Sequence, residues 1–168
     1  MNIYKGLGTA AVVTLISASI LTVVFLRAKA DSELSGIDYF NGKWTVTMKS
    51  NPAEPFNWEL RKDLDGTWLT GTVERGGVMI TRDFWIQRPT VIDRFAFTGN
   101  GTVVKVTSDG WKGDRLMFSG TLTDSRGSIN VRETIVRLGA DRFSALWERQ
   151  EENGTWVVFS DEICTRPG

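Results

Sequence analysis

Few side chains in this sequence could do chemistry, and Glu133 is the clearest candidate. It lies between apolar neighbours in the run Val131–Ile135, so its carboxyl group is either a buried acid with a raised pKa or half of an ion pair. Arg82 and Arg149 also lie among apolar residues, and one or both could meet Glu133. Such a network fixes packing more often than it performs catalysis, and we predict no catalytic residue.

Several residue types that enzymes and metalloproteins use are missing. The sequence contains no histidine, which removes the commonest general base, the commonest zinc ligand and the usual axial ligand of haem. The single cysteine, Cys164, cannot form an intramolecular disulfide, and we expect it to be buried rather than paired with another chain. The sequence therefore predicts no metal site and no cofactor.

The aromatic content points to binding. The chain has seven tryptophans. Indole rings that line a cavity suit a flat apolar ligand, whereas rings on the outside suit a membrane interface or a protein partner. Trp58 and Trp68 alternate with polar residues and could face inward. The candidate ligand-binding residues are Trp58, Trp68, Trp85, Glu133 and Arg149.

Short strands must position these side chains. Turn signals recur from Gly42 onward and include Asn100-Gly101 and Asn153-Gly154, whose residues tolerate positive φ and favour hairpins. Sequential hairpins without a long crossover predict an all-β, antiparallel up-and-down barrel of about ten strands rather than a β-sandwich. The predicted strands are 43–49, 56–61, 67–74, 78–87, 91–97, 103–107, 115–122, 129–137, 142–149 and 155–163.

Two short motifs at the ends of this region resemble those of lipocalins and the wider calycin superfamily. Gly42-Lys43-Trp44 opens the first strand, and Arg166 follows the last one. The resemblance implies a lipocalin-like barrel in which Gly42, Trp44 and Arg166 close one end, with the guanidinium stacked over the indole. The segment from Asp109 to Arg166 is similar to small bacterial lipocalin-like domains of unknown function. Nitrobindin-type barrels of the same superfamily hold haem through a histidine, which this chain lacks.

The N-terminal segment predicts a membrane helix. Gly6–Leu26 contains 21 residues without an ionisable side chain. As a helix it would be roughly 30 Å long, the thickness of the hydrocarbon core of a bilayer. The alternative is a cleaved signal peptide, because Ala28-Lys29-Ala30 has the form of a cleavage site, but the apolar stretch is longer than a typical signal. A retained anchor could pack against other transmembrane helices through its small residues Gly6, Ala10, Thr14, Ala18 and Thr22.

The chain is thus predicted to contain a membrane helix at 1–26, a linker at 27–38 and a barrel domain at 39–168. From Asp31 onward 17 basic residues stand against 20 acidic ones, and this mildly acidic balance argues against nucleic acid as a partner. Positive charges on the two sides of the helix are nearly equal. The signal-like boundary favours anchoring in a bacterial inner membrane with the domain in the periplasm.

Three functions compete at this point. The first is a non-enzymatic accessory subunit that docks on other transmembrane subunits of a respiratory, photosynthetic or transport complex. The second is a carrier or sensor of a small apolar ligand, such as a lipid or pigment, held in the barrel near the membrane. The third is an enzyme that acts on such a ligand through Glu133. Space inside the barrel separates the first two, because a filled barrel leaves only its outer surface for binding.

Overall fold

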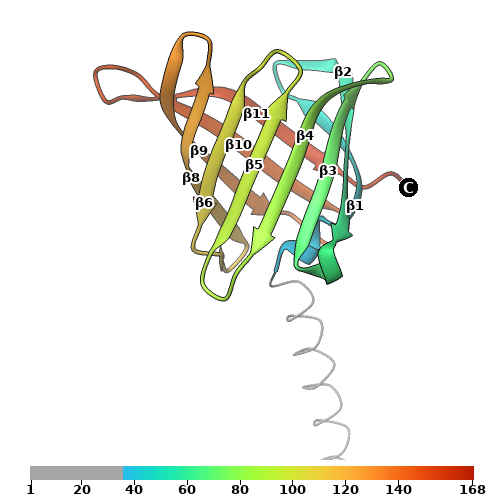
Figure 1. Ribbon diagram of the computed structural model, residues 1–168. Helices are drawn as coiled ribbons and strands as arrows, with labels where there is room; N and C mark the ends of the chain where they lie inside the picture. The colour runs from blue at the N-terminus through green and yellow to red at the C-terminus, as the bar shows by residue number, and fades with distance from the viewer. Residues whose placement is uncertain (1–35) are drawn as a thin grey trace, which may run out of the picture. The chain divides into compact units, whose positions relative to one another are not determined.

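The computed structural model describes residues 36–168. The predicted membrane helix and its small residues Gly6, Ala10, Thr14, Ala18 and Thr22 lie outside the described residues. Within residues 36–168, no helix is both long enough and apolar enough to cross a membrane. These residues form a closed antiparallel barrel (Figure 1).

Ten strands make the barrel wall, and each pairs antiparallel with the strands on either side of it. The barrel closes where the first strand pairs with the last. The two-residue strand β7 (Trp111–Lys112) is not part of the wall: it pairs only with the start of β8, and β8 pairs with β6 in the wall. This arrangement confirms the predicted all-β antiparallel up-and-down barrel of ten strands. The wall strands are β1 (Gly42–Met48), β2 (Asn51–Asp63), β3 (Trp68–Arg75), β4 (Val78–Gln87), β5 (Ile92–Thr98), β6 (Val103–Ser108), β8 (Arg115–Asp124), β9 (Gly127–Arg137), β10 (Arg142–Gln150) and β11 (Trp156–Thr165).

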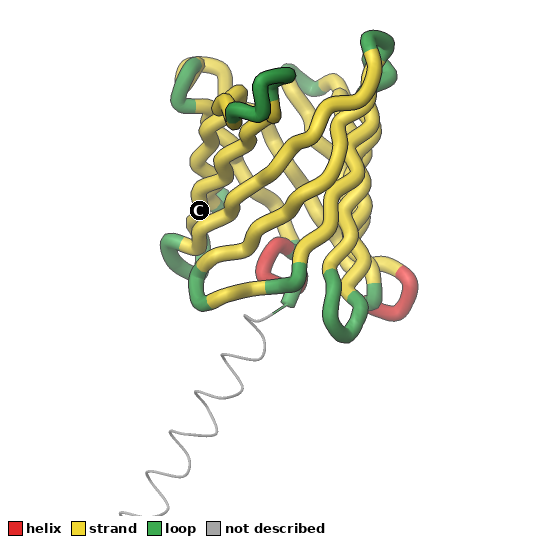
Figure 2. The backbone as a smooth tube through the Cα atoms, turned by 90° about the vertical axis from the view of Figure 1, so that its left-hand side faces the viewer, coloured by secondary structure: helices red, strands yellow, loops and turns green. Residues whose placement is uncertain are grey.

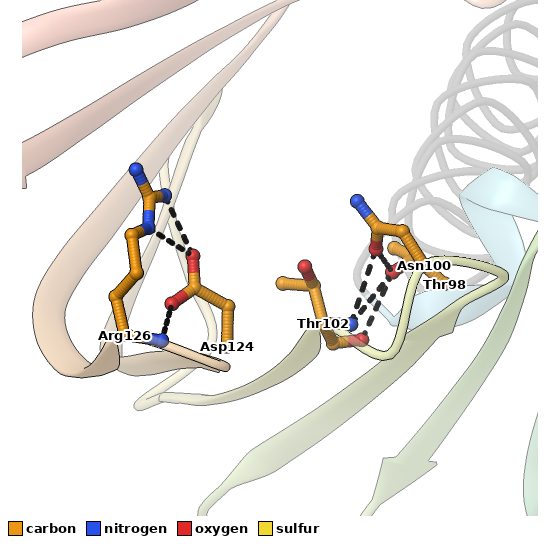
Figure 3. A network of polar contacts seen from close by, with 5 residues as sticks. All are labelled: Thr98, Asn100, Thr102, Asp124 and Arg126. Carbon is orange, nitrogen blue, oxygen red and sulfur yellow. Dashed lines mark hydrogen bonds and ion pairs between the residues drawn. The ribbon is translucent and has the colours of Figure 1, made fainter.

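Local sequence explains the hairpin turns. Gly101, in the turn between β5 and β6, has a φ of 86°, a conformation that glycine adopts without strain. The side chains of Thr98 and Asn100 both accept from the backbone N–H of Thr102, at 3.0 and 3.1 Å (Figure 3). Between β8 and β9, Asp124 likewise accepts from the backbone N–H of Arg126 at 2.8 Å. Side-chain bonds of this kind compete with extended structure and turn the chain.

Strand alternation decides which side chains face the barrel interior. In β9 the residues Val131, Glu133 and Ile135 are buried, and the residues between them are not. In β5 the buried residues Ile92, Arg94 and Ala96 alternate in the same way. Successive side chains of a strand point to opposite faces, so these residues line the interior.

The short helix η1 (Ile37–Phe40) lies at one end of the barrel, called the closed end (Figure 2). Aromatic side chains pack around it there. The Phe40 ring is stacked 5.8 Å from Trp111, and the hydroxyl of Tyr39 donates to the carbonyl of Gly139 at 2.9 Å. Ile37, Tyr39 and Phe40 are all buried. The predicted linker reached residue 38, but the structure places its last two residues in this helix.

Arg166 completes the closed end. Its guanidinium carbon lies 4.2 Å from the centroid of the Trp44 ring, and its two terminal nitrogens donate to the carbonyls of Asn41 and Tyr39 at 3.0 and 2.8 Å. Gly42 has a φ of 118°, and a Cβ atom there would stand 2.6 Å from Arg166 Nη1. Gly42, Trp44 and Arg166 therefore act together at the base of the barrel.

The opposite end, called the open end, carries the hairpins β1–β2, β3–β4, β5–β6, β8–β9 and β10–β11. Val157 of β11 pairs with Arg149, which pairs in turn with the buried, inward-facing Val131. Directly paired residues share a face of the sheet, so Val157 also faces inward. Ile129 lies two residues before Val131 on the same face of β9, and Phe159, at a register shift in β11, turns its ring toward Trp147, 6.1 Å away. Ile129, Val157 and Phe159 nevertheless keep 39, 39 and 40 % of their surface exposed. We call these three residues the mouth, because solvent reaches the interior there.

Candidate functional site

The barrel interior holds a buried ion-pair cluster centred on Arg94. Its Nε and Nη2 donate to the two carboxylate oxygens of Asp83 at 3.1 and 2.9 Å, a bidentate pair across β4 and β5. Its Nη1 donates to Glu133 of β9 at 2.6 Å. The side chain of Asp83 has no exposed surface, whereas that of Arg94 keeps 10 %. Because Arg94 faces inward, solvent touches it from inside the barrel.

Carboxyl groups outnumber the guanidinium in this cluster. Glu162 of β11 is a third acid close enough to influence both Glu133 and Arg94. Burial raises the pKa of Glu133 to about 7, against the opposing effect of the bond from Arg94. Burial also raises the pKa of Glu162, although the Ser160 hydroxyl donates to its carboxylate at 2.7 Å. One guanidinium cannot neutralise three carboxylates, so near neutral pH the cluster holds at least part of a proton.

Three indole rings surround the guanidinium of Arg94. Its central carbon lies 4.7 Å from the ring centroid of Trp85, 5.3 Å from that of Trp58 and 5.4 Å from that of Trp147. The electron-rich ring faces stabilise the cation that burial would otherwise disfavour. Burial by itself lowers the pKa of Arg94, but the charges of Asp83 and Glu133 more than offset it and leave that pKa raised.

Two of these indoles also bury their N–H group. Trp58 and Trp85 are 5 and 0 % exposed, and neither indole N–H has a hydrogen-bond acceptor among the described residues. Buried donors are almost always paired, because an unpaired one forfeits its bond to water. By contrast, the indole N–H of Trp44 at the closed end donates to the Phe40 carbonyl at 2.8 Å.

On the inward face of β9 the buried Val131 lies between Glu133 of this cluster and Ile129 of the mouth. The Phe159 ring of the mouth lies 6.1 Å from Trp147, one of the three indole rings around Arg94. On the strands β1 to β3, the Arg75 guanidinium lies 5.3 Å from the Phe56 ring and 3.9 Å from the sulfur of Met48.

The candidate residues fall in three places. Trp58, Trp85 and Glu133 come together in the cluster. Arg149 faces inward but lies at the open end, where it is bonded to Glu151 at 2.8 Å instead of reaching Glu133. Trp68 lies outside: its neighbour Leu69 is fully buried inside the barrel, so the alternation turns Trp68 outward, and the prediction of an inward Trp68 was wrong.

The partner of Glu133 was also predicted wrongly, because it is Arg94 rather than Arg82 or Arg149. In β4 the apolar residues Ile80, Phe84 and Ile86 face outward with Arg82, and Asp83 faces inward with Trp85. The apolar face of β4 is therefore the outer one, so the apolar neighbours of Arg82 did not mean that Arg82 faces the interior. The alternation of Ile92, Arg94 and Ala96 was a weak indication that Arg94 faces inward. The other face of β5, with Phe95 and Phe97, is equally apolar, so alternation alone did not decide between the two faces.

Cys164 is buried beside the cluster, and burial raises the pKa of its thiol. Across residues 36–168 no group of three or more His, Cys, Asp or Glu side chains is arranged to hold a metal ion. The fold and the site together define a ten-stranded antiparallel barrel with an internal ion-pair cluster and one open end. No protein-family model matches the sequence, and no curated protein matches it.

Proposed function

We propose that the chain is a non-enzymatic binding protein that takes a small apolar or amphipathic ligand into its barrel through the open end. One observation carries the proposal: Ile129, Val157 and Phe159 face inward, yet about two-fifths of each remains exposed. Apolar side chains that face inward are normally buried in a filled barrel. A ligand that covered these three residues would gain roughly 25 cal/mol for each Å² of apolar surface removed from water.

The closed end supports the same proposal. Helix η1 and the aromatic side chains block that end, so the mouth is the entrance that remains for a ligand. Gly42, Trp44 and Arg166 meet there in the way that the resemblance to lipocalins implies, and we propose that the barrel is lipocalin-like. Behind the predicted anchor at 1–26, such a barrel would work close to a membrane surface, in our proposal on its periplasmic side.

A pair of neighbouring valines provides the test. Val157 faces inward at the mouth, whereas Val158 pairs with Glu148 on the outer face and is 50 % exposed. The full chain is purified from membranes, and its bound small molecules are extracted and identified by mass spectrometry. We expect V157D to lose the bound molecule and V158D to keep it. Equal yields of ligand from the two variants, or a wild-type chain that carries nothing and binds no lipid added to it, would refute the proposal.

One observation favours accessory docking as a second candidate function. On the outer face of β4 and β5, Phe97 is 46 % exposed and its ring lies 5.9 Å from Phe84 in an edge-to-face contact. Exposed aromatic pairs are typical of protein–protein contact surfaces. We propose that this patch, together with the predicted anchor, could dock on membrane-embedded subunits. F97S should then reduce co-purification of such subunits while ligand content stays unchanged.

A further inference from the structure

If the barrel takes a ligand through its mouth, as proposed above, the buried end of that ligand meets the polar groups around Arg94. The most demanding of these groups are the indole N–H donors of Trp58 and Trp85, which are buried on the inward face and have no acceptor among the described residues. Their ring centroids lie 5.9 Å apart, so both donors belong to the same part of the interior, beside Arg94. A donor can be satisfied only by an acceptor, and here that means an oxygen of the ligand or of water.

The charges of the cluster exclude an anionic head group at this position. Arg94 is the cation there, and its Nε, Nη1 and Nη2 are already bonded to Asp83 and Glu133. Glu162 adds a further acid next to them. A carboxylate or phosphate brought to this place would lose its water and would meet acids rather than a free cation.

A cationic head group is excluded for a different reason. The ring faces of Trp58, Trp85 and Trp147 are already directed at the Arg94 guanidinium. A second cation in the same cage would lie a few ångströms from a permanent positive charge. The raised pKa values of Glu133 and Glu162 also favour carboxyl groups that keep their protons and act as O–H donors rather than as counter-ions.

We infer that the ligand enters with a neutral polar group first, and that this group carries a hydrogen-bond-accepting oxygen, as an ester, amide or ketone does. The oxygen accepts from the indole N–H groups of Trp58 and Trp85. The apolar remainder of the ligand extends past Trp147 and Phe159 to the mouth.

Three ligands that differ only in their head group test this inference: lauramide, laurate and laurylamine. Each is titrated into the full chain, kept soluble by an amphipathic polymer, at about pH 8, where laurate is an anion and laurylamine a cation. The heat of binding is measured after subtraction of a polymer-only blank. We expect lauramide to bind at least about tenfold more tightly than either charged ligand, the equivalent of one good hydrogen bond.

Phenylalanine substitutions then test the two indole donors. W58F and W85F keep an aromatic ring and remove the N–H, and each should lower the affinity for lauramide about three- to tenfold while the affinities for the charged ligands hardly change. W156F is the matched control, because Trp156 stacks on Arg132 at 4.4 Å on the outer face of the barrel. Circular dichroism and the thermal midpoint show whether each variant is folded.

The outcomes separate this inference from the proposed function. If none of the three ligands binds, the proposed function and the inference both fail. If all three bind equally, or if W58F and W85F keep the full preference for lauramide, the barrel binds ligands but the inference is wrong. A preference for laurate that R75A or R149A abolishes would also overturn it, because the head group would then lie at the mouth beside these arginines.

Discussion

The two ends of the barrel carry the same kinds of inward-facing side chain, but these are buried at one end and partly exposed at the other. At the closed end, inward-facing aromatic residues such as Trp44 and Phe143 are fully packed, with ring centroids 4.7 Å apart. At the open end, the inward-facing residues Ile129 and Phe159 stay partly exposed. The strands continue from one end to the other with the same alternation, so the difference comes from what fills the lumen. Helix η1 fills the closed end, and none of the described residues covers the mouth in the same way.

The ion-pair cluster lies between these two regions and separates them. On the side of the closed end it contacts packed aromatic rings: Trp85, one of the rings around Arg94, lies 4.7 Å from Phe40 of η1. On the side of the open end, solvent reaches the cluster at the exposed part of the Arg94 side chain. Burial at the closed end stabilises the fold, whereas the partly exposed apolar surface at the open end is the part of the interior that we propose a ligand covers.

The largest expected effect sets one end directly against the other. F143A removes a fully buried ring and should lower the free energy of unfolding by about 3–5 kcal/mol through lost contacts and a cavity. F159A should cost less than about 1 kcal/mol, because the ring is partly exposed already, but it should weaken ligand binding. Urea unfolding followed by circular dichroism measures both. Similar losses for the two variants would remove the distinction between the ends.

A somewhat smaller effect is expected from the cluster. R94M leaves Asp83 buried without its partner and should lower the free energy of unfolding by about 3 kcal/mol. Replacing both residues, as D83N with R94M, should recover part of the loss because Asp83 no longer leaves a buried charge without a partner, while Glu133 still lacks its bond from Arg94. The two variants are compared in the same urea titration. A double variant that is less stable than R94M would contradict this account of the ion pair.

The pH dependence of stability reports on the proton held by Glu133. Its pKa is about 7 in the folded chain against the usual 4.5, so the folded state binds more protons than the unfolded state between these values. Stability should therefore fall as the pH rises from about 4.5 to 7 and then level off, by an amount on the order of 3 kcal/mol.

E133Q should reduce this slope without removing it, because the pKa of Glu162 is raised as well. Unfolding free energies measured at several pH values across this interval check the prediction. A slope as steep in E133Q as in the wild-type chain would show that another group carries the proton.

At the base of the closed end the expected loss of stability is smaller than for F143A or R94M. R166A removes the cover of the Trp44 ring and the bonds to two carbonyls, and should cost about 1–2 kcal/mol. R166K should recover little of this, because an ammonium cannot reproduce the flat stack or the fork of donors. Ligand affinity should stay unchanged in both variants. A loss of binding in R166A with normal stability would mean that the closed end also takes part in ligand recognition.

Local signals in the sequence determined the strands and turns. Alternation with a period of two, together with pairs such as Asn100-Gly101 and Asn153-Gly154, acts over a few residues, and the predicted strand positions follow the observed ones closely. The structure adds residues that this signal does not cover. Strand β2 starts at Asn51, before the predicted Phe56, and helix η1 has too few residues for a periodic pattern.

The tertiary structure alone decided which face of each strand is inside and which charges meet. In β4 both faces look plausible, since one carries Ile80 and Phe84 and the other carries Asp83 and Trp85. Barrel closure turns Asp83 inward, and the register of the strands brings Arg94 to Glu133, 39 residues away. Alternation records that two faces differ but not which one is buried, and a long-range ion pair depends on pairing between strands that no short segment encodes.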